Sequence, residues 1–271
     1  MKENNEAKND VRDFWNQASC GEDLYLHSRD SEGFEAQMKM RYELEPYILD
    51  FAGFKDGAGK KVLEIGVGLG ADHEMWARNN PELYGVDLTP RAIQNTTERF
   101  KSKGLNSTLK VDDAENLSFA DNTFDIVYSW GVLHHSPNTP KAIDEVHRVL
   151  KPGGTAKIMI YYKYSFVGYM LWVKYALLKF KPFTSLKTIY HNYLESPGTK
   201  AYSKKEAFEL FKKYKDVQIT TVLTHGDLLT SAAGQRHEGK MLDIARKIWP
   251  RFIIKTFFPS HGLFMMITAK K

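Results

Sequence analysis

The sequence has almost no cysteine and no long apolar run. Of its 271 residues only Cys20 is a cysteine, which excludes a disulfide framework and a cysteine-based zinc site and is typical of a reducing compartment. No apolar stretch reaches the roughly 18 residues that a membrane-spanning helix needs. The first ten residues, MKENNEAKND, have no apolar core and do not predict a secretory signal. We therefore expect a cytoplasmic protein.

What the sequence does contain is typical of a globular enzyme, with 42% hydrophobic and 26% charged residues. Its net charge of +5 is unevenly distributed, because residues 151–271 hold 21 basic and 7 acidic groups while residues 1–150 hold 17 and 26. Such a division favours an anionic partner, although lysines spread over solvated helices would give the same count. There is no arginine-rich run or nucleic-acid-binding motif, so we expect no nucleic-acid partner.

Short apolar runs alternate with helical stretches between Lys60 and Tyr162, which predicts an α/β fold with a parallel sheet covered by helices on both faces. The expected strands span 61–65, 83–87, 108–111, 124–130 and 155–161, and the expected helices 71–79, 89–103 and 139–150. Two helical stretches, 9–17 and 33–51, precede this core. A capped helix at 203–213, a strand at 217–223, a helix at 242–249 and a last strand at 263–268 follow it.

The glycine-rich stretch EIGVGLG, from Glu64 to Gly70, lies between a predicted strand and a predicted helix. Glycines there allow a sharp turn and a close approach of the backbone to a ligand. Asp87 follows Gly66 by 21 residues, at the end of the next strand, where a carboxylate suits the two hydroxyls of a ribose. The loop also fits the dinucleotide fingerprint with a final alanine, so the glycines alone leave a dehydrogenase open.

Four later motifs narrow the choice: DDAENLSF at 112–119, FDIV at 124–127, VLHH at 132–135 and RVLKPGG at 148–154. Taken in order, they make residues 60–162 resemble the class I S-adenosylmethionine-dependent methyltransferases. The subgroup resembled includes the ubiquinone and menaquinone C-methyltransferases and many small-molecule O- and N-methyltransferases. The resemblance implies a Rossmann-like, seven-stranded, mostly parallel sheet whose last strand is antiparallel. It also implies S-adenosylmethionine as the cofactor and S-adenosylhomocysteine as the product.

The resemblance divides the chain into four parts. We expect an N-terminal helical cap at 1–58, a cofactor-binding core at 59–163, an aromatic helical lid at 164–200, and the last strands of the core at 201–271.

Cofactor contacts follow from the resemblance residue by residue. It assigns the loop under the methionine part to Glu64, Gly66, Gly68 and Gly70, the ribose hydroxyls to Asp87, and the adenine to Leu88, Asp113 and Ala114. Asp112 fits the role of Asp113 after a slip of one residue. Arg41 is a candidate partner of the cofactor carboxylate, and Phe14, Trp15, Tyr25 and Tyr42 are candidates to cover the cofactor.

Paired histidines follow the fourth strand, at the sheet edge where ligands of such folds lie. His134 is a candidate general base, because a neutral imidazole can take a proton from an acceptor. A structural or cofactor-shell role is the alternative for both histidines, and we place His135 and Trp130 in the cofactor pocket. The candidate acceptor contacts are Tyr25, Tyr162, Tyr169, Trp172 and His225. No spacing of histidines and carboxylates predicts a metal site.

The stretch 165–179 is apolar nearly all the way round a helix and is interrupted by lysines. It fits a lid over the acceptor, a dimer contact or an interfacial membrane helix, so peripheral membrane contact and the oligomeric state both stay open. We expect methyl transfer to O or N of a small or medium-sized acceptor, anionic or amphiphilic. The alternatives are a catalytically silent partner subunit, a C-methyltransferase of a quinone or lipid-like substrate, and an NAD-dependent dehydrogenase.

Overall fold

A single seven-stranded sheet organises the molecule in the computed structural model, which describes residues 2–231 and 246–271. The strand order is β3-β2-β1-β4-β5-β7-β6, and β7 alone runs antiparallel to its neighbours. This is the predicted Rossmann-like sheet, in which the last strand of the chain, β7, is antiparallel and lies next to the edge strand β6. The strands are β1 (Lys61–Ile65), β2 (Glu82–Asp87), β3 (Thr108–Val111), β4 (Phe124–Trp130), β5 (Leu150–Tyr161), β6 (Lys215–Val222) and β7 (Phe264–Lys270).

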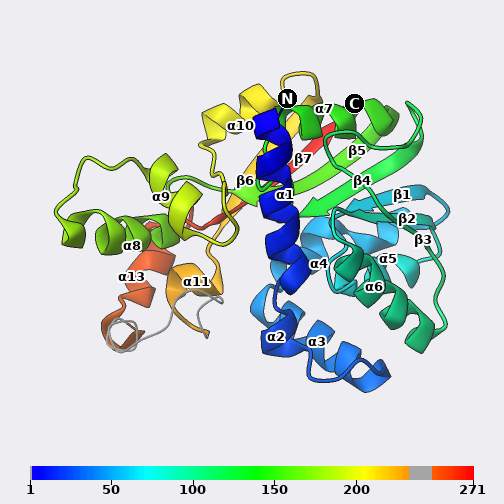
Figure 1. Cartoon of the computed structure of the whole chain (residues 1–271), viewed down its shortest axis with the longest axis horizontal. Coiled ribbons are helices and arrows are strands. Elements are labelled where there is room, and N and C mark those ends of the chain that lie inside the picture. The colour runs from blue at the N-terminus through cyan, green and yellow to red at the C-terminus, as the bar shows by residue number, and fades with distance from the viewer. Residues whose placement is uncertain (1, 232–245) are drawn as a thin grey trace.

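Helices cover both faces of the sheet (Figure 1). On one face α7 (Thr139–Val149) and α10 (Lys204–Leu210) bury Ile143, Val146 and Phe211 against the strands. On the other face Ile48, Phe54, Trp76 and Phe100 close a second apolar cluster. They belong to α4 (Tyr47–Ala52), the 3-10 turn η1 (Phe54–Gly57), α5 (Ala71–Ala77) and α6 (Pro90–Lys103).

Side-chain caps begin α6, α7 and α10, although the cap of α7 is Asn138 rather than the expected Thr139. The Thr89 hydroxyl accepts from the backbone N–H of Ala92 ahead of α6, and Asn138 accepts from Lys141 at the start of α7. Ser203 and Glu206 form the predicted capping box of α10. These local signals set the ends of the helices that carry the loops above the sheet.

The N-terminal part contains more helices than expected. Helix α1 (Lys2–Gln17) is longer than the predicted 9–17, and a short α2 (Glu22–Tyr25) follows it. The single helix expected over 33–51 is divided into α3 (Ser31–Leu44) and α4. The reason is Pro46, because the residue before a proline disfavours the helical conformation.

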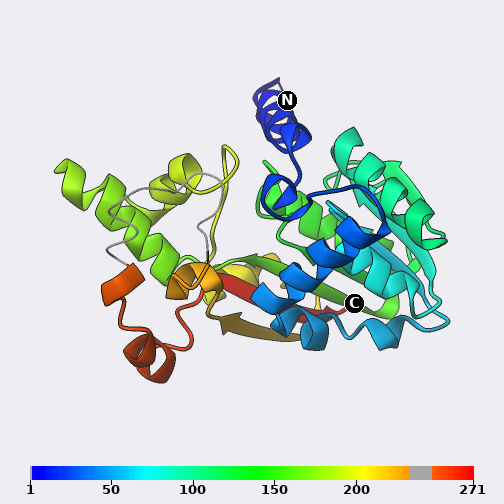
Figure 2. The same cartoon turned by 90° about the horizontal axis from the view of Figure 1, so that it is seen from below.

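A second lobe stands beside the sheet rather than on either face (Figure 2). It contains α8 (Phe166–Tyr175), the 3-10 turn η2 (Leu177–Lys179), α9 (Leu186–Tyr193), α11 (His225–Leu228) and α13 (Arg251–Phe257). Leu171 and Tyr190 pack with Met159 and Phe264 from the sheet. The lobe thus combines the expected insertion at 164–200 with segments between β6 and β7.

The helix expected at 242–249 is described only in part, and the lengths of the helices bear on membrane insertion. Of the helix expected at 242–249, residues 242–245 lie outside the described part of the chain, and 246–248 are helical. Within the described ranges, no helix has both the length and the apolar character needed to cross a membrane.

Candidate functional site

A cavity of about 890 Å³ lies where the carboxyl ends of β1, β2, β4 and β5 face the N-terminal helices and the second lobe. Its walls include the loop from Glu64 to Gly70 and the residues that follow β2, β3 and β4. The opposite wall comes from α8, the segment 194–195, and the segments 224–231 and 246–249. Residues that are far apart in the sequence therefore border one space.

The glycine loop borders this cavity in a conformation that favours glycine. Gly66, Gly68 and Gly70 have φ of 86°, 52° and 76°. A Cβ atom on Gly66 would lie 2.1 Å from Cγ2 of Val132, whereas nothing lies within 4 Å of one built on Gly68. The first glycine thus allows close packing against the loop after β4, and the second leaves the backbone open to a ligand.

Asp87 ends β2 beside that loop. Its carboxylate accepts from the N–H of Gly68 at 3.3 Å, and from the N–H and hydroxyl of Thr89 at 2.9 Å each. Burial raises the pKa of Asp87, although these donors oppose the rise. The arrangement places a carboxylate at the edge of the glycine loop, as predicted for a ribose-binding residue.

Glu64 takes part in a buried hydrogen-bond chain. The Ser107 hydroxyl donates to the carbonyl of Leu83 at 3.0 Å, so its oxygen accepts from Nε2–H of His73 at 2.7 Å. Burial lowers the pKa of His73 to about 3, so the ring is neutral and its Nδ1 accepts. Glu64 lies 2.9 Å from that Nδ1, and in this tautomer it donates as a neutral acid. Burial raises the pKa of Glu64 well above its usual range, which agrees with this assignment.

Asp112 and Asp113, the two candidates for the adenine-binding carboxylate, differ in their hydrogen-bond partners. Asp112 accepts from the N–H of Asp113 and from the N–H and hydroxyl of Ser118, so it stabilises its own loop. Asp113 accepts from the N–H of Glu115 in the same loop at 2.9 Å and from Lys8 of α1 at 2.6 Å, and both aspartates line the cavity with Ala114. The preference for Asp113 over Asp112 as the adenine-binding carboxylate therefore stays a prediction.

The N-terminal helices form one wall of the cavity. Trp15 packs edge-on against His135 with ring centroids 5.4 Å apart, and Phe14 and Tyr25 also line the space. Arg41 lines it too, but forms a bidentate ion pair with Asp72 at 2.9 and 2.7 Å. Burial opposes ionisation of Asp72, yet Arg41 and two tyrosine hydroxyls hold the pKa of that carboxyl below its usual value. Arg41 is thus already paired, and a role toward a cofactor carboxylate stays a prediction.

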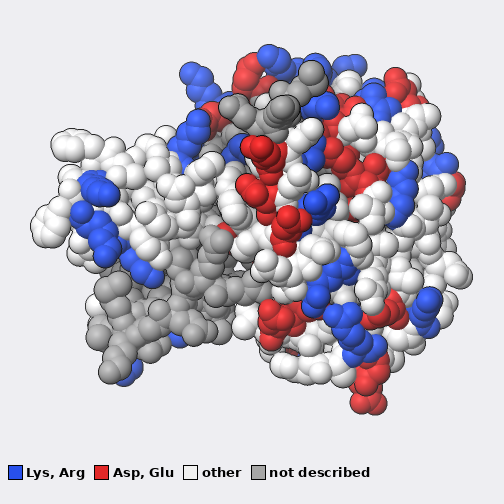
Figure 3. Space-filling model, in the orientation of Figure 1, with Lys and Arg blue, Asp and Glu red and all other residues white. Residues whose placement is uncertain are grey.

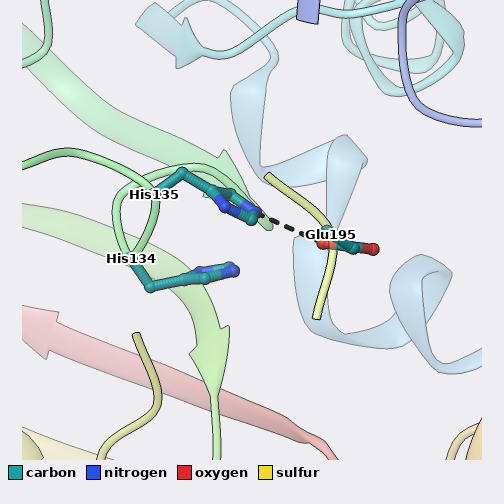
Figure 4. Close-up of side chains that lie close together, drawn as sticks. All are labelled: His134, His135 and Glu195. Atoms are coloured by element: carbon teal, nitrogen blue, oxygen red, sulfur yellow. Dashed lines mark ion pairs between the residues drawn. The ribbon is translucent and has the colours of Figure 1, made fainter. Parts of the chain in front are cut away.

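The paired histidines occupy different environments (Figure 4). His135 lines the cavity, with Nδ1 2.8 Å from the Ser196 hydroxyl and Nε2 3.4 Å from Oε2 of Glu195. Glu195 also accepts from the Tyr161 hydroxyl at 2.7 Å. His134 is fully buried behind it, against the ring of Tyr161 at 3.9 Å, and neither of its ring nitrogens has a hydrogen-bond partner in the described structure. Burial holds the pKa of His134 well below its usual value.

Within residues 2–231 and 246–271, His134, His135 and Glu195 are the group of side chains whose donor atoms lie close enough to hold a metal ion. The donor atoms of His134, His135 and Glu195 lie within 4.8 Å of one another. His135 and Glu195 already have the partners given above, and His134 does not line the cavity. The contacts of His135 and Glu195 with Ser196, Tyr161 and each other therefore explain their positions without a metal ion.

Three residues predicted to contact the acceptor or to act as base do not border the cavity: His134, Tyr162 and Trp172. His134 is enclosed by packed rings. Tyr162 is directed toward Tyr164, with ring centroids 5.8 Å apart, and Trp172 donates from its indole N–H to the carbonyl of Thr184 at 2.9 Å. Trp130, Tyr169 and His225 do line it.

Other lining residues carried no local signal in the sequence. Glu45 lies part-buried beside Arg41, and its loss of contact with water raises the pKa of Glu45 to about 7. Cys20 is an exposed free cysteine that also borders the cavity. Tyr161, Trp249 and Phe264 complete this end of the cavity. Only the path of the chain brings these groups together.

Comparison with known proteins now bears on this geometry. Residues 63–158 match a family model described as a methyltransferase domain. The core of this chain is a class I S-adenosylmethionine-dependent methyltransferase domain. The matched residues contain the glycine loop, Asp87, Asp113 and both histidines. The narrower resemblance to quinone C-methyltransferases stays a prediction.

Relatives of the methyltransferase domain act on several kinds of acceptor, according to their names. Phosphoethanolamine N-methyltransferase 1 of Triticum aestivum is 24% identical over 83% of this chain and 41% of its own length. Sterol 4-C-methyltransferase of Caenorhabditis elegans is 35% identical over 36% of this chain and 30% of its own length. This chain thus spans less than half the length of these curated relatives.

Solved structures share the fold. Phosphoethanolamine N-methyltransferase 2 of Haemonchus contortus, in complex with phosphomonomethylethanolamine and S-adenosylhomocysteine, aligns with a TM-score of 0.58. It is 19% identical and covers 96% of this chain and 60% of its own. A S-adenosylmethionine-dependent methyltransferase of Archaeoglobus fulgidus aligns with a TM-score of 0.56 at 15% identity, covering 89% of this chain and 97% of its own.

Proposed function

We propose that this chain transfers the methyl group of S-adenosylmethionine to an oxygen or nitrogen of a small or medium-sized amphiphilic acceptor. The observation that carries the proposal is a single cavity of about 890 Å³ lined both by the glycine loop and by the second lobe. Ligand sites range over about 300–1,000 Å³, so a cavity of this size suits two adjacent small molecules.

The cofactor would occupy the end of the cavity next to the sheet. The open backbone at Gly68 would lie beneath its methionine part, and Asp87 would accept from the ribose hydroxyls. Asp113 and the backbone N–H of Ala114 would bind the adenine edge, which presents a donor beside acceptors, while Leu88 packs on the ring. All of these groups line the cavity.

The acceptor would lie at the other end, where apolar and polar groups occur together. Phe166, Tyr169 and Met170 offer an apolar wall, while Glu45 and Glu195 provide polar ends. Among the described residues after 150, only two basic side chains border the cavity, Lys174 and Arg246. The positive balance of that half therefore lies mostly outside the cavity, which favours an amphiphile over a simple anion.

The chemistry asks little of the protein beyond alignment. When bound, the cofactor supplies an electrophilic methyl group on a sulfonium, which an acceptor lone pair takes by direct displacement as the carbon–sulfur bond breaks. The protein holds the two molecules in line and excludes water. If Nδ1–H of His135 donates to Ser196, its Nε2 is free to take the proton that the acceptor loses. Glu195, 3.4 Å away, would stabilise the resulting imidazolium.

Transfer to carbon of a quinone or lipid-like substrate and a catalytically silent partner subunit are the alternatives. Both would retain the cofactor end of the cavity. They differ from the proposal in what happens at the other end, so a transfer assay separates them.

The test is transfer of tritium from [methyl-³H]S-adenosylmethionine to dodecylamine, dodecyl phosphate, nonylphenol and phosphoethanolamine. Tyr169→Ala removes an aromatic wall of the cavity, and Tyr164→Ala removes an exposed tyrosine of the same lobe that does not line it. We expect labelled product from at least one amphiphile, with Tyr169→Ala alone raising its KM. Cofactor binding without transfer to any of these acceptors would favour the silent subunit, and label on carbon would favour C-methylation.

A further inference from the structure

The second lobe exposes large apolar side chains that other parts of the described surface do not match. Phe180 and Phe183, between α8 and α9, are 93% and 100% exposed. Ile248 and Phe252, before and within α13, are 75% and 79% exposed. Monomeric soluble proteins seldom leave so many large apolar side chains in water, so such a surface marks an interaction site.

These apolar side chains are accompanied by charges of one sign. The segments 164–194 and 246–263 contain eight basic residues and no acidic residue. Lys179, Lys181 and Lys187 are exposed around the two phenylalanines, and Lys247 and Lys255 around α13. On the face seen in Figure 3, the described part of the lobe carries blue side chains on a white surface, and most red side chains lie over α1 and the rest of the molecule.

The charge pattern argues against a second copy as the occupant. Two copies meeting through these segments would bring five exposed lysines against five, with no carboxylate in either segment to pair with them. Like charges at an interface cost binding energy. A bilayer containing anionic lipids offers an apolar medium to the phenylalanines and negative charge to the lysines.

We propose that the second lobe docks on the surface of an anionic lipid bilayer through Phe180, Phe183, α13 and the surrounding lysines. Bulky apolar side chains would insert among the lipid headgroups, and the basic side chains would contact lipid phosphates. Docking of this kind needs no membrane-spanning helix.

The position of the surface also gives it a role in acceptor delivery. Val173 and Leu178 line the cavity and are themselves 40% and 56% exposed, so the cavity wall continues into the proposed membrane surface. An amphiphilic acceptor would pass from the bilayer into the cavity along this edge. That part of the inference rests on the proposed function, whereas docking itself does not.

The experiment is flotation of the full chain with vesicles of phosphatidylcholine alone or of phosphatidylcholine with phosphatidylglycerol. We expect the chain to float with the anionic vesicles and to be released as salt is raised. The variant Phe180→Ser/Phe183→Ser changes two side chains that bury nothing, so it should fold and bind S-adenosylhomocysteine normally. It should float at least about tenfold less, as loss of two inserted phenyl groups implies. Phe208→Ser, an exposed phenylalanine of α10 on the sheet, is the matched control.

Failure of the wild-type chain to float with anionic vesicles would overturn the proposal, as would undiminished flotation of Phe180→Ser/Phe183→Ser. If the wild-type chain is a dimer in analytical ultracentrifugation and the variant Phe180→Ser/Phe183→Ser is a monomer, the surface binds a second copy of the chain instead. Because vesicle binding needs no acceptor turnover, a failed transfer assay and a failed flotation assay are distinguishable.

Discussion

Nζ of Lys8, in α1, lies 2.6 Å from Oδ2 of Asp113, in the loop after β3. The same ammonium lies 3.1 Å from Oε2 of Glu115. Burial opposes the charge on Lys8, yet hydrogen bonds to the two carboxylates raise its pKa. The ion pair holds α1 over the end of the cavity proposed for adenine. Further along the same helix, Trp15 packs against His135.

Replacing Lys8 with Met should loosen α1 without unfolding the sheet. We expect faster amide hydrogen exchange across α1 and unchanged exchange in β4 and β5, because only the helix loses its anchor. Arg12→Met is the control, since among the described residues Arg12 pairs with its exposed neighbour Asp13 alone, at 3.4 Å. Equal exchange of α1 in the wild type and in Lys8→Met would show that the ion pair does not hold the helix.

Asp87→Ala should weaken the binding of S-adenosylhomocysteine by about 1–3 kcal/mol, the range for hydrogen bonds to charged groups. The carboxylate ends a strand beside the glycine loop, so its loss leaves the sheet intact. Asp125→Ala is the matched control, because Asp125 pairs with Lys151 at the start of β4 and does not line the cavity. Calorimetric titration measures both, and unchanged affinity in Asp87→Ala would mean that the ribose binds elsewhere.

Replacing His134 and replacing His135 should have different effects in a methyl-transfer assay. His135→Gln should lower kcat by roughly 10²–10⁴, the usual contribution of a general base, and leave the affinity for S-adenosylhomocysteine nearly unchanged. His134→Phe keeps a ring against Tyr161 and should leave turnover close to wild type. The opposite order, with turnover lost only in His134→Phe, would return the catalytic role to His134.

Acid should destabilise the fold partly through His134. In the unfolded chain this residue titrates near about 6.5, whereas burial keeps its pKa in the folded chain far lower. Below that pH the unfolded state therefore binds a proton that the folded state excludes, so the free energy of unfolding falls as pH falls. The share is at most about 1.4 kcal/mol per pH unit.

Urea denaturation at neutral and mildly acidic pH measures this effect. The decline should be shallower in His134→Phe, which has no group to titrate at that position, while His73 contributes equally to both proteins. Identical slopes would contradict the burial of an uncharged, unpaired imidazole.

Local sequence signals predicted the half of the site that depends on strand ends. Gly68 and Asp87 meet because adjacent parallel strands end at one edge, and both strands were evident as apolar runs. The division of the predicted helix at Pro46 was also readable from local chemistry, since the residue before a proline resists the helical conformation.

The other half depends on the path of the chain. Glu195 reaches His135 only because the segment after α9 returns to the cavity, and no spacing in the sequence encodes that return. His134 and His135 look equivalent as neighbours, yet the turn after β4 buries one and directs the other to the cavity. Burial at the end of α3 raises the pKa of Glu45 although the neighbouring Arg41 charge lowers it, and composition does not reveal that burial.

Calorimetric titration of the full chain with S-adenosylhomocysteine tests the central claim most directly, with NAD⁺ titrated in parallel. The account predicts saturable binding of S-adenosylhomocysteine to a single site and no heat from NAD⁺. Absence of S-adenosylhomocysteine binding, or tighter binding of NAD⁺, would contradict the assignment of the glycine loop and Asp87 to S-adenosylmethionine.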